Sequence, residues 1–186
     1  MQKIIVGFVG DLAAGKGTLA SYLALKYNCN TYRFSTMLRD ILDRIYIEKT
    51  RENLQDLSTL LRERFGQDIM SKVITKDVLE DEGQLVVVDG IRRPTDISYL
   101  KEIPGFHLIY ITADPQIRYE RMKLRNENPG DADKSFEQFC TDEQSEADKL
   151  IKELGAQAEN TIHNDGNFDT LYTQIETLLK HYGYQG

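Results

Sequence analysis

The sequence contains little of several residue types, and each shortage excludes a class of protein. It has two cysteines, Cys29 and Cys140, three histidines and no tryptophan. Two cysteines without metal-ligand spacing exclude a disulfide framework and a zinc-binding module, and they fit a reducing compartment. No apolar run is long enough to span a bilayer, and the first run is too short for a signal peptide. We therefore expect a cytoplasmic protein with an ordinary hydrophobic core and no membrane partner.

Positive charge is scarce in the last third of the chain. The net charge is −7, and residues 126–186 hold 4 lysines against 13 acidic residues, while all 11 arginines lie between Arg33 and Arg125. A protein that binds nucleic acid normally presents a basic face or tail, which this distribution does not provide. Arginines in the middle of an acidic chain favour a focused phosphate site, so we expect small nucleotides as partners. The oligomeric state stays open.

A glycine-rich stretch near the N-terminus carries the strongest functional signal. Residues 10–18 read Gly-Asp-Leu-Ala-Ala-Gly-Lys-Gly-Thr. The apolar run 4–9 before them predicts a buried strand, and the apolar periodicity of residues 19–25 predicts a helix. In this context backbone N–H groups and the helix N-terminus surround a phosphate, and Lys16 reaches the outer phosphates. A glycine-rich turn with a chance lysine is the weaker alternative. The residues expected to bind the nucleotide are Gly10, Asp11, Ala13, Ala14, Gly15, Lys16, Gly17 and Thr18.

The loop departs from the general phosphate-loop pattern at one position. That pattern has Ser or Thr directly after the lysine, whereas this chain has Gly17 there and Thr18 one place later. The Gly-Lys-Gly-Thr form resembles the nucleoside monophosphate kinases, such as adenylate kinase. The resemblance implies ATP and Mg²⁺ as cofactors. It also implies that Thr18 meets phosphate and that the metal is held largely through water.

A segment after the first helix resembles the acceptor site of adenylate kinases. Ser35-Thr36-Met37-Leu38-Arg39 is similar to their S-T-G-D-M-L-R segment, although it is two residues shorter. The resemblance implies that Thr36 and Arg39 bind the acceptor nucleotide, while a solvated arginine is the other interpretation of Arg39. Ser35 is the expected N-cap of this helix. Helical periodicity continues over 50–80 with a break at Gly66, so that about 35–80 forms a helical acceptor-binding region or, alternatively, a plain helical pair.

The segment 84–89, which is apolar and β-branched over 85–88, predicts a buried strand that ends in Asp89. An acid at the carboxyl end of a buried parallel strand faces the ligand crevice, so we expect Asp89 to hold Mg²⁺ through water. The following Gly90-Ile91-Arg92-Arg93 resembles the D-G-F-P-R of adenylate kinases, whose arginine binds the acceptor phosphate. Counting from Asp89 gives that role to Arg93. The D-G-I-R of a related family of archaeal P-loop NTPases gives it to Arg92, and both stay candidates. Pro94 is expected to begin a helix.

Three arginines, Arg118, Arg121 and Arg125, share one face of a helix that Asp114-Pro115 should begin. They repel one another unless an anion such as a polyphosphate joins them. In adenylate kinases two arginines spaced by four lead into the lid and stabilise the transferring phosphoryl group. The resemblance gives these roles to Arg121 and Arg125.

The resemblance also implies a short lid over about 118–140, with its tip at Pro129-Gly130. After it, Ser135 is expected to cap one long helix that ends near Gly155. Asn164 and Asp165 border the adenine in this interpretation, although residues of their type also form turns.

Strands that alternate with helices predict a three-layer α/β sandwich around a five-stranded parallel sheet, in one domain over residues 1–186. The resemblance implies a P-loop nucleoside monophosphate kinase that transfers the γ-phosphoryl group of ATP to a (deoxy)nucleoside monophosphate. Its catalytic residues would be Lys16, Arg93, Arg121 and Arg125.

Two alternatives remain, a hydroxyl kinase similar to dephospho-CoA kinase and a nucleotide-binding switch or ATPase. A hydroxyl acceptor needs a carboxylate base, and residues 34–36 after the second predicted strand contain no acid. A phosphate acceptor is therefore favoured, and Asp11 is the one residue that could supply the base for a hydroxyl.

Overall fold

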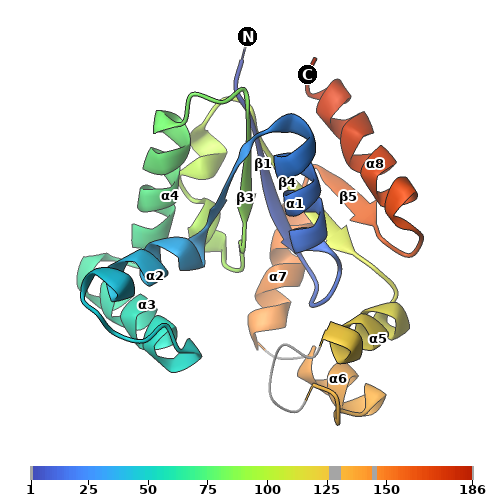
Figure 1. The fold of residues 1–186 in the computed structure, drawn as a ribbon, viewed down its shortest axis with the longest axis horizontal. Coiled ribbons are helices and arrows are strands. Elements are labelled where there is room, and N and C mark those ends of the chain that lie inside the picture. Colours follow the sequence, from blue (N-terminus) through green and yellow to red (C-terminus); the bar gives the residue numbers. More distant parts are fainter. Residues whose placement is uncertain (1, 126–130, 144–145, 186) are drawn as a thin grey trace.

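The structure is a computed structural model that describes residues 2–125, 131–143 and 146–185. Five strands form one sheet in the order β2-β3-β1-β4-β5, and every neighbouring pair is parallel. This confirms the expected parallel α/β fold (Figure 1). The strands are β1 (Ile4–Gly10), β2 (Asn30–Arg33), β3 (Leu85–Asp89), β4 (Phe106–Thr112) and β5 (Asn160–His163).

Helices cover both faces of this sheet (Figure 1). Side chains of β1 and β3 alternate between two apolar cores because successive residues of a strand point to opposite faces. Phe8 and Val87 face the core formed with α1 and α8, whereas Val9 and Val88 face the core formed with α2, α4 and α7. Both strands are buried along their whole length, which explains their continuous apolar sequences. The helices are α1 (Lys16–Tyr27), α2 (Phe34–Arg44), α3 (Arg51–Phe65), α4 (Ile69–Glu80), α5 (Pro115–Arg125), α6 (Phe136–Asp142), α7 (Glu146–Gln157) and α8 (Phe168–His181).

The helical region after β2 follows the predicted order, with a correction at its start. Helix α2 begins at Phe34, and Arg33 occupies its N-cap position, so Ser35 is not the cap. Helices α3 and α4 are separated at Gly66, which has φ +105° and confirms the predicted break. Thr50 caps α3 by accepting a hydrogen bond from the backbone N–H of Asn53.

The expected long helix after Ser135 is wrong. Ser135 caps the short helix α6, and α7 is a separate helix that continues through Gly155. A glycine is needed at that position because a Cβ there would lie 2.8 Å from the ring of Tyr110. The residue therefore permits close packing of α7 on β4 and does not end the helix.

Pro94 begins only the short 3₁₀ helix η1 (Pro94–Ile97), which a second one, η2 (Leu100–Glu102), follows. The expected lid tip at Pro129-Gly130 lies outside the described residues. No described helix has both the length and the apolar character needed to cross a bilayer.

Candidate active site

The glycine loop joins β1 to α1 at the carboxyl ends of the strands, and two glycines shape it. A Cβ at Gly10 would lie 2.0 Å from the carbonyl oxygen of Ile111 on β4, so only glycine fits beside that strand. Gly15 has φ +104° and occupies the N-cap position of α1, which has no side-chain cap. The loop therefore leads directly into an uncapped helix N-terminus, where backbone N–H groups are available to an anion.

Lys16 lies over this loop. Its Nζ donates hydrogen bonds to the carbonyl oxygens of Gly10 at 2.6 Å and of Asp11 at 2.7 Å. Burial lowers the pKa of Lys16 to about 8, the charge of Asp89 opposes this shift, and the charges of Arg92 and Arg125 add to it. The structure thus brings Lys16, Asp89, Arg92 and Arg125 within electrostatic range of one another.

Arg121 projects from the same helix as Arg125. Its Nη1 atom is buried and has no hydrogen-bond partner within the described part of the chain. A buried guanidinium nitrogen of this kind is available to an anionic ligand.

Asp89 ends β3 and forms an ion pair with Arg33, which ends β2. The Nε and Nη2 atoms of Arg33 both lie 2.9 Å from Oδ2 of Asp89, and Oδ1 accepts the backbone N–H of Gly90 at 2.7 Å. The two residues are paired in the register of the parallel strands. The sequence analysis did not identify Arg33, because its position beside Asp89 depends on a strand pairing that has no local sequence signal.

The carboxylate of Asp11 points to β4. It accepts hydrogen bonds from the hydroxyl groups of Tyr110 at 2.7 Å and Thr112 at 2.6 Å, and only 8% of Asp11 is exposed. Burial and this hydrogen bond raise the pKa of Tyr110, so its hydroxyl stays a donor. Asp11 is therefore already engaged in bracing the loop against the sheet.

Arg118, on α5, is also buried. Its Nη2 lies 3.0 Å from Oε2 of Glu143, its Nη1 also binds that carboxylate, and its Nε donates to the carbonyl oxygen of Ala113 at 2.8 Å. The sequence analysis grouped Arg118 with Arg121 and Arg125 on one helix face. The structure instead pairs Arg118 with a protein carboxylate, and this pairing removes the repulsion that motivated a third phosphate ligand.

Asn164 braces the loop from the end of β5. Its Nδ2 donates to the carbonyl oxygen of Ala14 at 2.8 Å, and a Cβ at Gly15 would lie 2.3 Å from that nitrogen. Asp165 accepts a hydrogen bond from the backbone N–H of Asp114. Both residues thus have local structural partners at the place where the sequence analysis expected an adenine border.

Arg92 and Arg93, to which the resemblance assigns the acceptor phosphate, lie on a loop after β3 that a buried ion pair supports. Oδ2 of Asp96 accepts the backbone N–H groups of Arg92 and Arg93, each at 3.0 Å. Oδ1 of Asp96 lies 3.0 Å from Nη2 of Arg62, which projects from α3. Asp96 and Arg62 are both buried, whereas the side chains of Arg92 and Arg93 are exposed. Neither Arg62 nor Asp96 was identified from the sequence.

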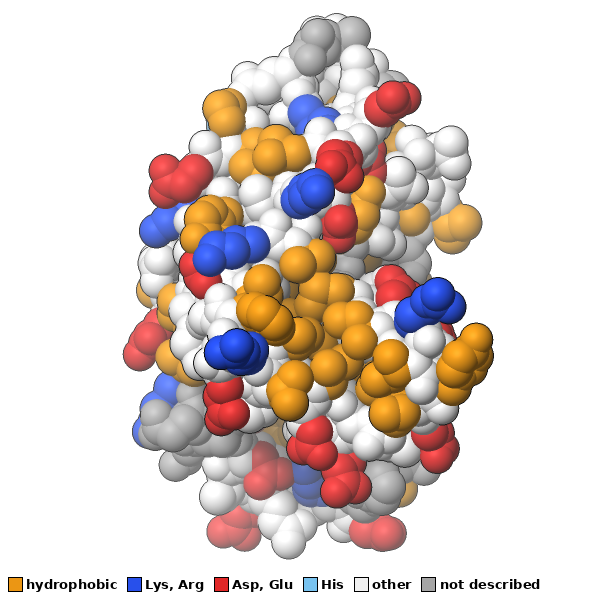
Figure 2. All heavy atoms as spheres, turned by 90° about the vertical axis from the view of Figure 1, so that its left-hand side faces the viewer, with side chains coloured by type: hydrophobic (Ala, Val, Ile, Leu, Met, Phe, Trp, Pro, Cys, Tyr) orange, Lys and Arg blue, Asp and Glu red, His pale blue; other side chains and the backbone are white. Residues whose placement is uncertain are grey.

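Thr36 and Arg39 occupy different surroundings on α2. Thr36 lines a cavity of about 560 Å³ between β2, α2 and α4, together with Arg33 and Asp40, whereas Arg39 is exposed and does not line it. Apolar side chains gather on the side of the molecule that these helices form (Figure 2). Of the two side chains that the resemblance assigned to the acceptor, Thr36 thus lines this cavity and Arg39 does not.

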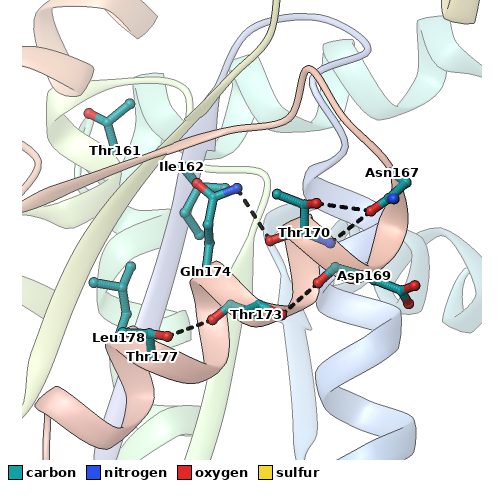
Figure 3. A pocket seen from close by; sticks show the side chains of 9 residues that line it. All are labelled: Thr161, Ile162, Asn167, Asp169, Thr170, Thr173, Gln174, Thr177 and Leu178. Atoms are coloured by element: carbon teal, nitrogen blue, oxygen red, sulfur yellow. Dashed lines mark hydrogen bonds between the residues drawn. The ribbon is translucent and has the colours of Figure 1, made fainter.

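A second cavity, of about 530 Å³, lies between β5 and α8 (Figure 3). Several of its polar side chains already have partners. Thr173 and Thr177 donate to carbonyl oxygens of their own helix, and Gln174 binds both backbone groups of His163. Gln174 therefore covers the free edge of the sheet, and none of the predicted site residues lines this cavity.

The two residues expected to hold magnesium lie at the end of β3 and in the first turn of α1: Asp89, which is already paired with Arg33, and Thr18. Within the described ranges no three His, Cys, Asp or Glu side chains are grouped as metal ligands. Asp89 and the hydroxyl of Thr18 are oxygen donors of the kind that Mg²⁺ prefers. A site with so few protein ligands suits an ion that keeps several waters and binds substrate phosphates.

A family model and several curated proteins match most of this chain. The model of the AAA_17 family, described as an AAA domain, matches residues 9–139. A UPF0200 protein of Staphylothermus marinus is 27% identical over 180 residues, which cover 97% of this chain and 93% of that protein. A UPF0200 protein of Hyperthermus butylicus is 26% identical over 185 residues, which cover 100% of this chain and 98% of that protein.

Solved structures show the same fold. Shikimate kinase from Bacteroides thetaiotaomicron aligns with 97% of this chain and 99% of its own, with a TM-score of 0.65 at 15% identity. Shikimate kinase from Acinetobacter baumannii in complex with shikimate aligns with 98% of this chain and 96% of its own, with a TM-score of 0.59 at 17% identity. At these identities the likeness shows the P-loop kinase fold and not a substrate.

Proposed function

We propose, from the premise that the chain belongs to the AAA_17 (AAA domain) family and has the P-loop kinase fold, that it transfers the γ-phosphoryl group of ATP to the phosphate of a (deoxy)nucleoside monophosphate. The observation that carries the proposal is the cluster around Lys16. Its ammonium group lies over the glycine loop, with Asp89, Arg92 and Arg125 in electrostatic range. Phosphoryl transfer needs positioning and charge neutralisation, which such a cluster supplies.

Each part of the cluster has a role in this proposal. The backbone of residues 10–18 and the N-terminus of α1 hold the ATP phosphates, and Lys16 neutralises the charge on the transferring group. Arg121 and Arg125 approach ATP from α5, which forms the base of the lid. Asp89 and Thr18 hold Mg²⁺ through water. When bound, the metal neutralises the charge on the β- and γ-phosphates.

A phosphate acceptor is favoured by the state of the acidic side chains. A nucleotide phosphate is already ionised at neutral pH and needs cations, not a base. Of the two carboxylates that act on Lys16, Asp11 is bound by Tyr110 and Thr112, and Asp89 is bound by Arg33. Arg92 and Arg93 have exposed side chains beside this centre and are the acceptor-phosphate candidates.

A hydroxyl kinase is the second candidate function. The solved structures that share the fold include shikimate kinases, one of them in complex with shikimate. The likeness favours only the shared fold, so the acceptor must be tested directly.

The experiment is a screen of ATP consumption against nucleoside monophosphates, deoxynucleoside monophosphates, shikimate and dephospho-CoA. We expect turnover with a monophosphate, and Lys16→Met should reduce it by about 10²–10³-fold, the effect of removing one preorganised transition-state charge. Lys26→Met is the matched control, because Lys26 lies on the same helix and pairs with Glu176. Turnover that needs no acceptor would favour an ATPase or switch, and turnover only with shikimate or dephospho-CoA would favour a hydroxyl kinase.

A further inference from the structure

The Arg33–Asp89 ion pair stands at the place where the expected metal would bind. It joins the last residues of β2 and β3, so the register of the sheet fixes it next to the glycine loop. The side chain of Asp89 is only 8% exposed, whereas that of Arg33 is 53% exposed. The carboxylate is thus buried at the end of its strand, whereas the guanidinium group that pairs with it is half-exposed to solvent.

Both oxygens of Asp89 are engaged in this arrangement. Oδ2 receives two guanidinium nitrogens, and Oδ1 receives the backbone N–H of Gly90. A divalent cation with its waters needs the same oxygens, and its charge repels a guanidinium group at this distance. Binding of the metal and closure of the ion pair therefore oppose each other.

Gly17, in the first turn of α1, lies beside this guanidinium group. Nη2 of Arg33 lies 3.4 Å from the position that a Cβ at Gly17 would take. In the general loop pattern this residue is Ser or Thr, whose hydroxyl binds Mg²⁺ directly. Here a positive side chain lies against the first turn of α1, where that pattern has a metal ligand.

We propose that Arg33 is a positioning residue that competes with the divalent cation for Asp89. When the cation binds, the guanidinium group is released from Asp89 and becomes available to an anionic acceptor phosphate. Because linkage is reciprocal, a phosphate that draws Arg33 away also strengthens the binding of the metal. The inference concerns the metal in the nucleotide site, and it rests on the proposed function only for the identity of the phosphate.

The test measures Mn²⁺ binding to the complex with ADP by electron paramagnetic resonance, without any acceptor or turnover. Arg33→Met should bind Mn²⁺ about tenfold more tightly than the unaltered protein, within the usual range of coupling between two sites. Arg33→Lys keeps the positive charge and should stay near the unaltered affinity. Arg44→Met is the matched control, because Arg44 is an arginine of α2 that lines the same cavity as Arg33 and forms no ion pair with Asp89 in the described part of the chain. Circular dichroism checks that each variant is folded.

A double-mutant cycle separates the competition from an indirect effect. In an Asp89→Asn background the gain from Arg33→Met should disappear, because the contested carboxylate is gone. Equal or weaker Mn²⁺ binding by Arg33→Met, or a gain that persists in the Asp89→Asn background, would overturn the inference and leave the proposed function intact. If ADP did not bind to the unaltered protein, the proposed function and this inference would both be refuted.

Discussion

Replacing Asp96 by alanine should destabilise the protein and weaken acceptor binding at the same time. Asp96 is buried and binds Arg62 through one oxygen and the backbone N–H groups of Arg92 and Arg93 through the other. The substitution would leave the buried guanidinium group of Arg62 without its carboxylate. It would also free the loop that carries both acceptor arginines.

The magnitude follows from the burial of both partners. Removing one partner of a buried ion pair typically costs about 3–5 kcal/mol, because the other charge stays buried and uncompensated. In a protein of this size each kcal/mol lowers Tm by about 2–4 °C, so we expect a decrease of about 6–20 °C. The apparent KM for the acceptor should rise, while ADP binding by the glycine loop should change little.

Urea unfolding and acceptor kinetics measure the two effects. Glu80→Ala is the control, because it removes an exposed carboxylate that lies 3.7 Å from Lys76 and should cause no measurable loss. Arg62→Met should cost less in the Asp96→Ala background than alone, because the pair is then already broken. A loss below about 1 kcal/mol for Asp96→Ala, or strictly additive losses, would refute the proposed support of the arginine loop.

Three further predictions concern the loop, its lysine and the lid. Gly15→Ala should destabilise the loop and weaken ADP binding, because φ is +104° there and the new Cβ would displace the amide group of Asn164 from Ala14. Gly90→Ala should cost only about 1–2 kcal/mol of stability, since φ is +83° but the space around it is open. If calorimetry showed that Gly90→Ala weakens ADP binding as much as Gly15→Ala does, this reasoning would be contradicted. Because the pKa of Lys16 is lowered from 10.5 to about 8, the unfolded chain binds more protons between these values, and stability relative to Lys16→Met should rise with pH across that window. If urea unfolding gave a stability difference between the two proteins that did not change with pH, burial would not lower the pKa of Lys16. A bisubstrate analogue should protect 118–125 and 131–135 from hydrogen exchange, and unchanged exchange there would contradict a closing lid.

The elements that sequence reasoning predicted are those with local signals. β1 and β3 are continuous apolar runs because a parallel strand with helices on both faces is buried all round. The glycine loop can be recognised from its sequence, because its backbone conformation and its contact with Ile111 permit no side chain at Gly10. The break at Gly66 and the cap at Ser135 are equally local.

The residues that sequence reasoning missed depend on packing between distant segments. Arg33 meets Asp89 through strand register, and Arg62 meets Asp96 through the position of α3, over 56 and 34 residues of chain respectively. Gly155 was interpreted as a helix end because its partner, the ring of Tyr110, comes from another element. Asp11 was the candidate base for a hydroxyl acceptor, but two hydroxyl groups of β4 bind it. In each case the deciding contact is tertiary.

The most direct test of the central claim is the identity of the product bond. Phosphorus NMR of the protein with ATP, Mg²⁺ and each nucleoside monophosphate from the screen distinguishes a phosphoanhydride from a phosphomonoester. Lys16→Met serves as the blank. We predict a new phosphoanhydride, seen as a nucleoside diphosphate that forms at the rate at which ATP is consumed. A new phosphomonoester on a hydroxyl group, or ADP and inorganic phosphate alone, would contradict transfer to a nucleotide phosphate.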